Sequence, residues 1–403
     1  MNGYSLSKRA VEESLFCVAL AFSCLVLPSK VLRAAVGLEL SALFGAAFML
    51  LASLAFLTRK VRVHNNSFWL AFSMALIGGL ASVIASSPTH LMLGVSAGFT
   101  VYISESCRLA LVGKRVATFF LLSSYLALLS SAIGIAYAYF GGMPLFSVHV
   151  DGRDNLLYLS TFSVAEVGGF IRPSWIFDEP GALAMYLVIA AVFIIREGSF
   201  RNHLKFILPA SLLTTSLVMF LIVLLYLVLT FRIKRSLKLL LGTLLTCGVI
   251  LTIMPGVFDL IGSFIEGAFL DRLALEDGRV AGDNRSNQVI EFFSLLNSDI
   301  LWRGAFALHS PPPFHDQSSH PFSIIFFYGI LLWLPYAGVV IILISGCLLK
   351  EGNARFASAA MLLLLLQRPY LYHLAWMIQV IFALSLLGVF RLQLSGAFDR
   401  SER

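Results

Sequence analysis

Residues 204–231 read LKFILPASLLTTSLVMFLIVLLYLVLTF, an almost wholly apolar run. The run is longer than the about 20 residues with which one helix crosses the hydrocarbon of a bilayer. Basic residues bracket it at Arg201 and Lys205 and again at Arg232, Lys234 and Arg235. Since basic residues favour the inner side, the run predicts two short helices with a turn near residues 214–216. That turn must be covered by protein or open to water.

Apolar runs recur along nearly the whole chain. Of its 403 residues 59% are hydrophobic and 13% are charged, and the mean hydropathy is +0.88. Backbone in lipid must satisfy its hydrogen bonds internally, so such runs become helices. We expect an all-α polytopic membrane protein, one integral domain over residues 1–403. About 12 transmembrane helices are expected, at residues 14–28, 35–57, 67–86, 90–106, 116–140, 181–195, 204–214, 216–231, 238–254, 323–349, 355–367 and 370–390.

The basic residues support this layout, with both termini on the inner side. Of the 29 Lys and Arg residues, 20 fall on the inner side, as the positive-inside rule requires. The net charge of +7 therefore belongs to helix ends and does not indicate a nucleic-acid partner. The five cysteines lie in or beside apolar runs, which predicts neither disulfides nor a metal site.

Two long outer loops, residues 141–180 and 255–322, carry polar residues that the topology does not require. The first ends in RPSWIFDEPG, residues 172–181. Pro180 suits the first turn of a helix, and Asp178 and Glu179 suit its N-terminus. Arg172 presents a planar fork of donors that matches phosphate, which makes it a candidate phosphate ligand. The alternative is that Arg172 pairs with Asp178 or Glu179 and fixes the loop.

The second outer loop contains GRVAGDNRSNQ, residues 278–288, with Arg279 and Arg285. Residues 283–284 can cap a helix over about 285–296. Arg285 then falls in the first helical turn, where the helix dipole does not favour a cation. A residue placed against local preference is a candidate for function. The alternative is a surface arginine paired with Asp283.

Three histidines, His309, His315 and His320, close the second loop. Their spacings do not match those of a zinc site. His320 directly precedes the apolar run 322–334, so we expect it at the membrane surface. A neutral imidazole there can accept a proton from a hydroxyl group. The alternative role for His320 is a helix-end cap.

Taken in order, these segments resemble motifs of the Wzy-type O-antigen polymerases and the related O-antigen ligases. The resemblance covers roughly residues 141–344, and the matching segments lie on the outer side or in the hairpin. It rests on residues 172–181, the turn at 214–216, Arg285 with LWRG at 301–304, and His320 with Gly329.

The resemblance implies a C-type glycosyltransferase-like fold with two long periplasmic loops. It implies a metal-independent glycosyltransferase without a cofactor, which polymerises undecaprenyl-diphosphate-linked oligosaccharide repeat units at the periplasmic face of the bacterial inner membrane. Fixed cations would stabilise the charge of the leaving diphosphate. The implied diphosphate ligands are Arg172, Arg285, Arg279 and Arg303. The implied general base is His320, with Glu179 as its rival.

The implied partners are the lipid-linked oligosaccharide, membrane lipid and a chain-length regulator. An O-antigen ligase, which passes the glycan to lipid A core, uses the same donor and stays an alternative. A flippase for the lipid-linked unit is a further alternative. Flippases are expected to show repeats and charges at mid-helix. Such charges are nearly absent here apart from Glu39 and Glu105.

Overall fold

The computed structural model describes residues 18–37, 39–40, 43–45, 47, 65–106, 114–150, 153–167, 170–230, 275–276, 279–280, 285–309 and 320–390. Its helices are η1 (Phe22–Val26), α2 (Lys30–Val36), α4 (Asn65–Ala85), α5 (Pro88–Ser106), α7 (Lys114–Tyr139), α8 (Pro180–Glu197), η2 (Arg201–His203), α9 (Leu204–Ala210), η3 (Ser211–Thr214), α10 (Leu217–Thr230), α14 (Arg285–Leu295), α15 (Ser298–Arg303), η5 (Ala305–Ala307), α16 (Ser323–Tyr328), α17 (Ile330–Leu349), α18 (Gly352–Gln367) and α19 (Leu374–Leu386). The predicted helix at 238–254, most of the one at 35–57 and both chain termini lie outside the described residues.

Among the described residues, four helices are long and apolar enough to cross a membrane: α4, α7, α8 and α17. A fifth candidate is the segment from residue 18 through α2, which bends by 93° between its two helical parts. The helices α10 and α19 are apolar but shorter. These spans support a membrane protein, and the full number of 12 crossings stays a prediction.

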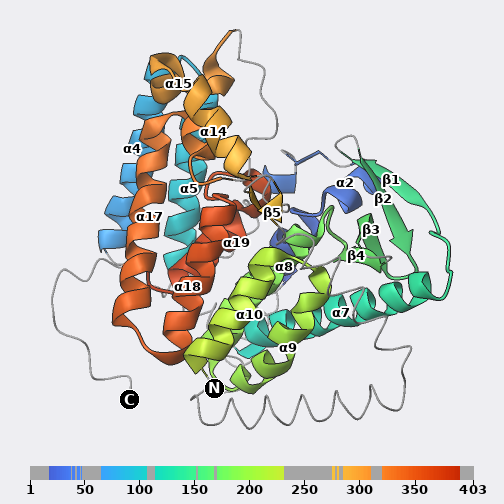
Figure 1. The fold of residues 1–403 in the computed structure, drawn as a ribbon. Helices are drawn as coiled ribbons and strands as arrows, with labels where there is room; N and C mark the ends of the chain where they lie inside the picture. The colour runs from blue at the N-terminus through green and yellow to red at the C-terminus, as the bar shows by residue number, and fades with distance from the viewer. Residues whose placement is uncertain are drawn as a thin grey trace, which may run out of the picture.

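Helix α8 forms the centre of the fold. Its sequence, PGALAMYLVIAAVFIIRE, is apolar on every face, which is typical of a helix that is surrounded by protein. Every residue from Ala182 to Ile195 is buried. The helix packs against α7, α18 and α19. Figure 1 shows α4, α5 and α17 on one side of α18 and α19, and α7, α8 and α10 on the other.

The first outer loop departs from the all-α expectation. It folds as a four-stranded antiparallel sheet in the order β1 (Ser147–Val150), β2 (Arg153–Tyr158), β3 (Thr161–Val167) and β4 (Phe170–Trp175). The sheet lies beside the C-terminal part of α7 (Figure 1), with β4 making the closest packing. A side chain at Gly134 of α7 would clash with Thr161, so the glycine permits this approach. The all-α class is therefore wrong for this loop, because short strands stabilised by pairing across the chain carry little local signal.

The apolar run at 204–231 breaks where the sequence predicts. Helix α9 ends at Ala210, the short η3 continues to Thr214, and α10 begins at Leu217. Thr215 takes a left-handed conformation, with φ +50°, and reverses the chain. Thr214, Thr215 and Ser216 are all buried, so the turn is covered by protein. Its covering comes from α7, α8 and β4.

Two glycines join the second outer loop to the next membrane helix. The predicted helix at 323–349 breaks at Gly329, which has φ +80° and separates α16 from α17. Gly304 ends α15 with φ +76°. A side chain on Gly304 would strike the backbone at Phe327, and one on Gly329 would strike the backbone at Trp302. The two positions therefore let α15 and α16 pack with their backbones in contact.

Candidate functional site at the start of α8

The polar cluster at the N-terminus of α8 begins with two acidic residues. Strand β4 ends at Trp175, and three residues later the chain reaches Asp178 and Glu179. Glu179 is the N-cap residue of α8 with extended backbone, and Pro180 opens the helix. Both carboxylates therefore lie where the helix dipole favours negative charge.

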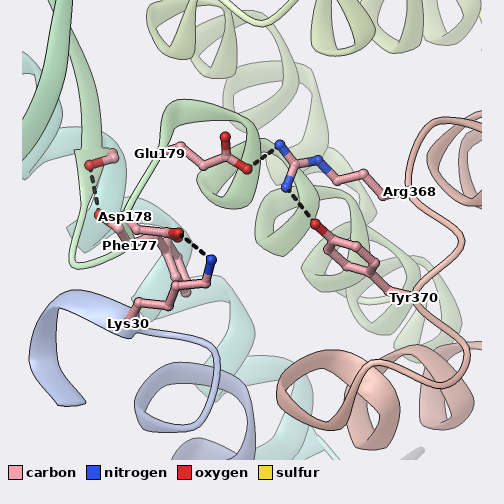
Figure 2. A network of polar contacts seen from close by, with 7 residues as sticks. Lys30, Phe177, Asp178, Glu179, Arg368 and Tyr370 are labelled. Atoms are coloured by element: carbon pink, nitrogen blue, oxygen red, sulfur yellow. Dashed lines mark hydrogen bonds and ion pairs between the residues drawn. The ribbon is translucent and has the colours of Figure 1, made fainter. Parts of the chain in front are cut away.

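Arg368 forms an ion pair with Glu179 (Figure 2). It comes from the turn between α18 and α19, far from Glu179 in the sequence. The Arg368 side chain is 9% exposed, whereas that of Glu179 is 32% exposed. A Cβ atom at Gly181 would lie 2.6 Å from Nη2 of Arg368, so the glycine leaves the space that the guanidinium occupies.

Lys30 pairs with the other carboxylate. Its Nζ atom lies 3.3 Å from Oδ2 of Asp178. Lys30 is the first residue of α2, which is capped by Ser29. The Ser29 hydroxyl also donates to the carbonyl of Ile176, and this bond fixes the start of α2 against the segment that leads into α8. Figure 2 shows Lys30 and Arg368 approaching the two carboxylates from different elements.

An aromatic group completes the cluster. Nη1 of Arg368 donates to the hydroxyl of Tyr370 at 3.0 Å, and the guanidinium carbon lies 5.6 Å from the centre of that ring. The rings of Tyr370 and His373 are 4.7 Å apart, and Tyr370 also stacks on Trp376 at 6.2 Å. Burial lowers the pKa of His373 to about 4, and the nearby cations, Lys30 first among them, act in the same direction. His373 is therefore neutral at physiological pH.

The two carboxylates of the cluster titrate differently. Burial alone would raise the pKa of Glu179, but the charge and hydrogen bonding of Arg368 outweigh it and hold that pKa below its ordinary 4.5. Burial raises the pKa of Asp178 above its ordinary value, and the charge of Lys30 offsets this only in part. Glu179 is thus the carboxylate that stays ionised most firmly.

Arg172 joins two of the segments that the sequence singled out. It lies in β4, and its Nε atom donates to Oγ1 of Thr215 at 2.8 Å. Thr215 is the left-handed residue of the hairpin turn, 43 residues further along the chain. Asp178 and Glu179 pair with Lys30 and Arg368, and the alternative that Arg172 also pairs with one of these carboxylates stays a prediction.

Trp175 belongs to the core. Its ring contacts Phe177 and Tyr186, each at 6.1 Å, and only 7% of the residue is exposed. The backbone N–H of Trp175 donates to the hydroxyl of Thr161 at 2.8 Å. Trp175 therefore holds the end of β4 against α8.

His320 packs against aromatic side chains of the second outer loop. Its ring centre is 5.6 Å from that of Phe292 and 6.4 Å from that of Phe322. The residue is 1% exposed, and its expected place at the membrane surface stays a prediction. Its carbonyl accepts the backbone N–H of Ser323, which fits the alternative role as a helix-end residue. Arg285 opens α14, the helix that carries Phe292 two turns later.

The two remaining predicted arginines lie in other elements of the second outer loop. Arg303 is the last residue of α15, and its carbonyl accepts a hydrogen bond from Nε2 of His90 at 3.1 Å. Arg279 lies in β6 (Arg279–Val280), which pairs with β5 (Leu275–Glu276). The side chains of Arg279 and Arg285 lie outside what the structure describes. The role of these arginines as diphosphate ligands therefore stays a prediction.

The predicted site residues with described side chains lie near two hydrophobic clusters. Arg172 and Glu179 flank Trp175 and Phe177, which belong to the large buried cluster around α8. His320 and Arg303 lie near the small cluster that contains Phe292 and Phe326. In the described part of the chain, the ion pairs of Asp178 and Glu179 with Lys30 and Arg368 lie at the start of α8.

Sequence reasoning did not single out Lys30, Arg368 and Tyr370. A signal for the two cations was present, because nine of the 29 basic residues were not assigned to the inner side. They are Lys30, Arg33, Arg153, Arg172, Arg272, Arg279, Arg285, Arg303 and Arg368. The positive-inside rule does not explain basic residues that lie away from the inner side, so all nine were candidate site residues. Nothing in the sequence marked Tyr370.

The arrangement places two cations, Lys30 and Arg368, beside two carboxylates at the N-terminal end of α8. The described part of the chain contains no group of three or more His, Cys, Asp or Glu residues placed to bind a metal ion. A comparison of the chain with protein-family models, curated proteins and solved structures found no match.

Proposed function

We propose that the chain is a membrane glycosyltransferase that polymerises saccharide units carried on undecaprenyl diphosphate. The reaction would take place at the periplasmic face of the bacterial inner membrane. The single observation that carries the proposal is the cluster at the start of α8, in which Arg368 and Lys30 face Glu179 and Asp178. The resemblance of residues 172–181 to the arginine motif of the O-antigen polymerases points to the same segment.

The charge of the cluster suits a diphosphate. Lys30 and Arg368 bring two positive charges, and Arg33 of α2 adds a third nearby. Asp178 and Glu179 bring at most two negative charges, and Arg172 adds a cation on the strand that leads into the cluster. A diphosphate that leaves from the donor sugar gains negative charge, and fixed guanidinium groups in a partly dry site stabilise it.

Glu179 is the more accessible of the two candidate bases. Its side chain is 32% exposed, so an acceptor can reach it. His320 is 1% exposed and packs between aromatic rings. In the proposed step, the acceptor hydroxyl attacks the anomeric carbon while the bond from that carbon to the diphosphate breaks. The hydroxyl proton passes to Glu179, and Arg368 keeps the carboxylate oriented.

The position of the cluster suits a lipid-linked donor. It lies at one end of α8, a candidate membrane span of 18 residues, and such a helix is about 27 Å long. This length is close to the about 30 Å of bilayer hydrocarbon. A diphosphate at this level would leave the polyprenol tail in the membrane and the sugars in water.

The test is elongation of a polyprenyl-diphosphate-linked saccharide in membrane vesicles. Glu179→Gln and Arg368→Gln are each expected to lower elongation by about 100-fold or more, the range for loss of a general base or of a charge-stabilising group. Asp154→Asn is the matched control, because Asp154 is exposed on β2 and pairs with His149. His320→Gln is expected to keep activity within about ten-fold. Wild-type elongation in both site variants would refute the proposal.

The same donor serves an O-antigen ligase, and the deletion phenotype separates the two. Single capped repeat units in the deletion strain indicate a polymerase, whereas long polymer left on the carrier lipid indicates a ligase. A flippase predicts a third result, in which lipid-linked units accumulate on the cytoplasmic side and vesicles elongate none of them.

A further inference from the structure

A second polar feature lies at the other end of α8. A cavity of about 590 Å³ opens where the C-terminal ends of α8, α17 and α19 meet the start of α18. This volume lies within the range of about 300–1,000 Å³ that is typical of ligand pockets. Because α8 runs away from Glu179, the cavity is separated from the candidate active site by the length of the helix.

Three cations line this cavity. They are Arg196 in the last turn of α8, Arg201 in η2 and Lys350 directly after α17. One carboxylate, that of Glu351, lines it as well. The charged lining therefore carries an excess of two positive charges, which is a substantial charge for a chain with so few charged residues.

Two of these cations are held in place by main-chain carbonyls. Nε of Arg201 donates to the carbonyl of Ile195 at 3.0 Å, near the end of α8. Nζ of Lys350 donates to the carbonyl of Leu387, just after α19, at 2.8 Å. Bonds of this kind position the cations at the cavity without neutralising their charge.

The deeper wall of the cavity is apolar. Val192, Ile195, Ala357 and Leu386 line it together with the cations, and all four are buried. A polar rim over an apolar wall fits an amphipathic ligand, one whose charged group meets the cations while its hydrocarbon continues along the helices. A small hydrophilic anion would leave this apolar wall without a contact.

The cavity lies at the level of membrane headgroups. Both α8 and α17 are candidate membrane spans, and Arg196 and Lys350 mark their ends. The positive-inside rule explains why basic residues occur there. It does not require that three of them converge on one cavity between helices. Basic pockets of this kind between transmembrane helices suit the headgroups of anionic lipids.

We propose that this cavity binds the phosphate of an anionic phospholipid from the cytoplasmic leaflet. Arg196, Arg201 and Lys350 contact the phosphate oxygens, and the first carbons of the lipid lie against the apolar wall. The bound lipid ties the ends of α8, α17 and α19 together by bridging cations that otherwise repel one another. This binding is separate from the chemistry proposed at the other end of α8.

The test measures equilibrium binding of fluorescent phosphatidylglycerol to the full chain in detergent. Substitution of all three cations by glutamine is expected to weaken lipid binding on the order of 100-fold. Each single substitution contributes a weakening of about tenfold or less to this total. The matched control is the triple substitution Lys114→Gln, Arg115→Gln and Lys205→Gln. These residues are exposed on the same basic side but do not line the cavity.

A second variant keeps every charge. Ala354 lines the cavity and is exposed, so Ala354→Trp is expected to fill the space and to weaken binding at least tenfold, whereas Ala354→Ser leaves it unchanged. Equal losses in the two triple variants would overturn the proposal in favour of diffuse attraction. Equal binding of phosphatidylcholine would overturn it as well. Displacement of the lipid by inorganic phosphate at a similar concentration would identify free phosphate as the ligand and reject the lipid.

Discussion

Gly181→Ala tests whether the Arg368–Glu179 ion pair organises the start of α8. The new methyl carbon would lie 2.6 Å from Nη2 of Arg368, whereas ordinary contacts begin at 3.4 Å. The guanidinium must therefore withdraw by about 0.8 Å. Glu179 and Tyr370 both hold it in its present position, so the withdrawal weakens these contacts.

Two effects of Gly181→Ala oppose each other. Alanine in place of glycine favours a helix by up to about 1 kcal/mol. Breaking a buried ion pair costs about 3–5 kcal/mol. We take about 2 kcal/mol for the pair with Arg368, because Glu179 is 32% exposed and solvent screens its charge. The variant is therefore expected to be less stable than the wild type by about 1 kcal/mol.

The assay is unfolding of the purified protein in detergent, followed by tryptophan fluorescence. Trp376 is a local probe because its ring stacks on Tyr370. The control is Gly79→Ala, whose new methyl would meet only Leu91 at 3.8 Å and which is expected to be neutral or stabilising. A double-mutant cycle with Arg368→Lys completes the design, since lysine lacks the atom that the methyl strikes.

The cycle gives a clear criterion. In the lysine background Gly181→Ala is expected to be neutral or to stabilise by up to about 1 kcal/mol, which gives a coupling free energy of about 1–2 kcal/mol. If Gly181→Ala stabilises the protein as Gly79→Ala does, the guanidinium moves freely and the ion pair does not organise this end of α8. If the cost is the same in both backgrounds, its cause is something other than Arg368.

Three further predictions concern other contacts. Thr215→Val removes the acceptor of Arg172 and is expected to cost about 1.5–3 kcal/mol in unfolding free energy, the range for a hydrogen bond to a charged group. The pKa of Glu179 is lower in the folded protein than its ordinary 4.5, so its ionised form stabilises the folded state. This stability is present above pH 4.5 and is lost as the pH falls through the pKa of the folded state. Glu179→Gln is therefore expected to flatten the acid limb of a plot of unfolding free energy against pH. Gly304→Ala combines positive φ with a backbone clash and is expected to destabilise by more than about 2 kcal/mol, whereas Gly338→Ala, which faces open space, is expected to be nearly neutral.

Each of these predictions has a result that would contradict it. Serine at position 215 keeps a hydroxyl, so equal losses in the serine and valine variants would show that the hydrogen bond is not the cause. An acid limb that is unchanged in the glutamine variant would assign the pH dependence to other groups, such as His373, whose lowered pKa acts in the same direction. Equal stability of the two alanine variants would show that α15 and α16 can separate without cost.

The sequence by itself predicted the long apolar helices α4, α7, α8 and α17, which could cross a membrane, and the full number of 12 crossings stays a prediction. Long apolar runs and the basic residues between them are local signals. Each helix forms its backbone hydrogen bonds within itself, and basic residues in loops favour the inner side of the membrane. The same reasoning located the turn at 214–216, including the requirement that protein cover it. It also identified Arg172 and Glu179, since their residue types and the proline after them are readable in one short segment.

Only the tertiary structure decided which of these residues meet. The sheet at β1–β4 depends on pairing between strands and on a glycine in α7 that lets it approach, and neither is visible in a single segment. Arg368 reaches Glu179, and Thr215 reaches Arg172, because distant segments pack around α8. The same packing buries Trp175 and His320 among aromatic side chains. Such contacts depend on how distant segments pack in three dimensions, and the local pattern of residue types does not predict this packing.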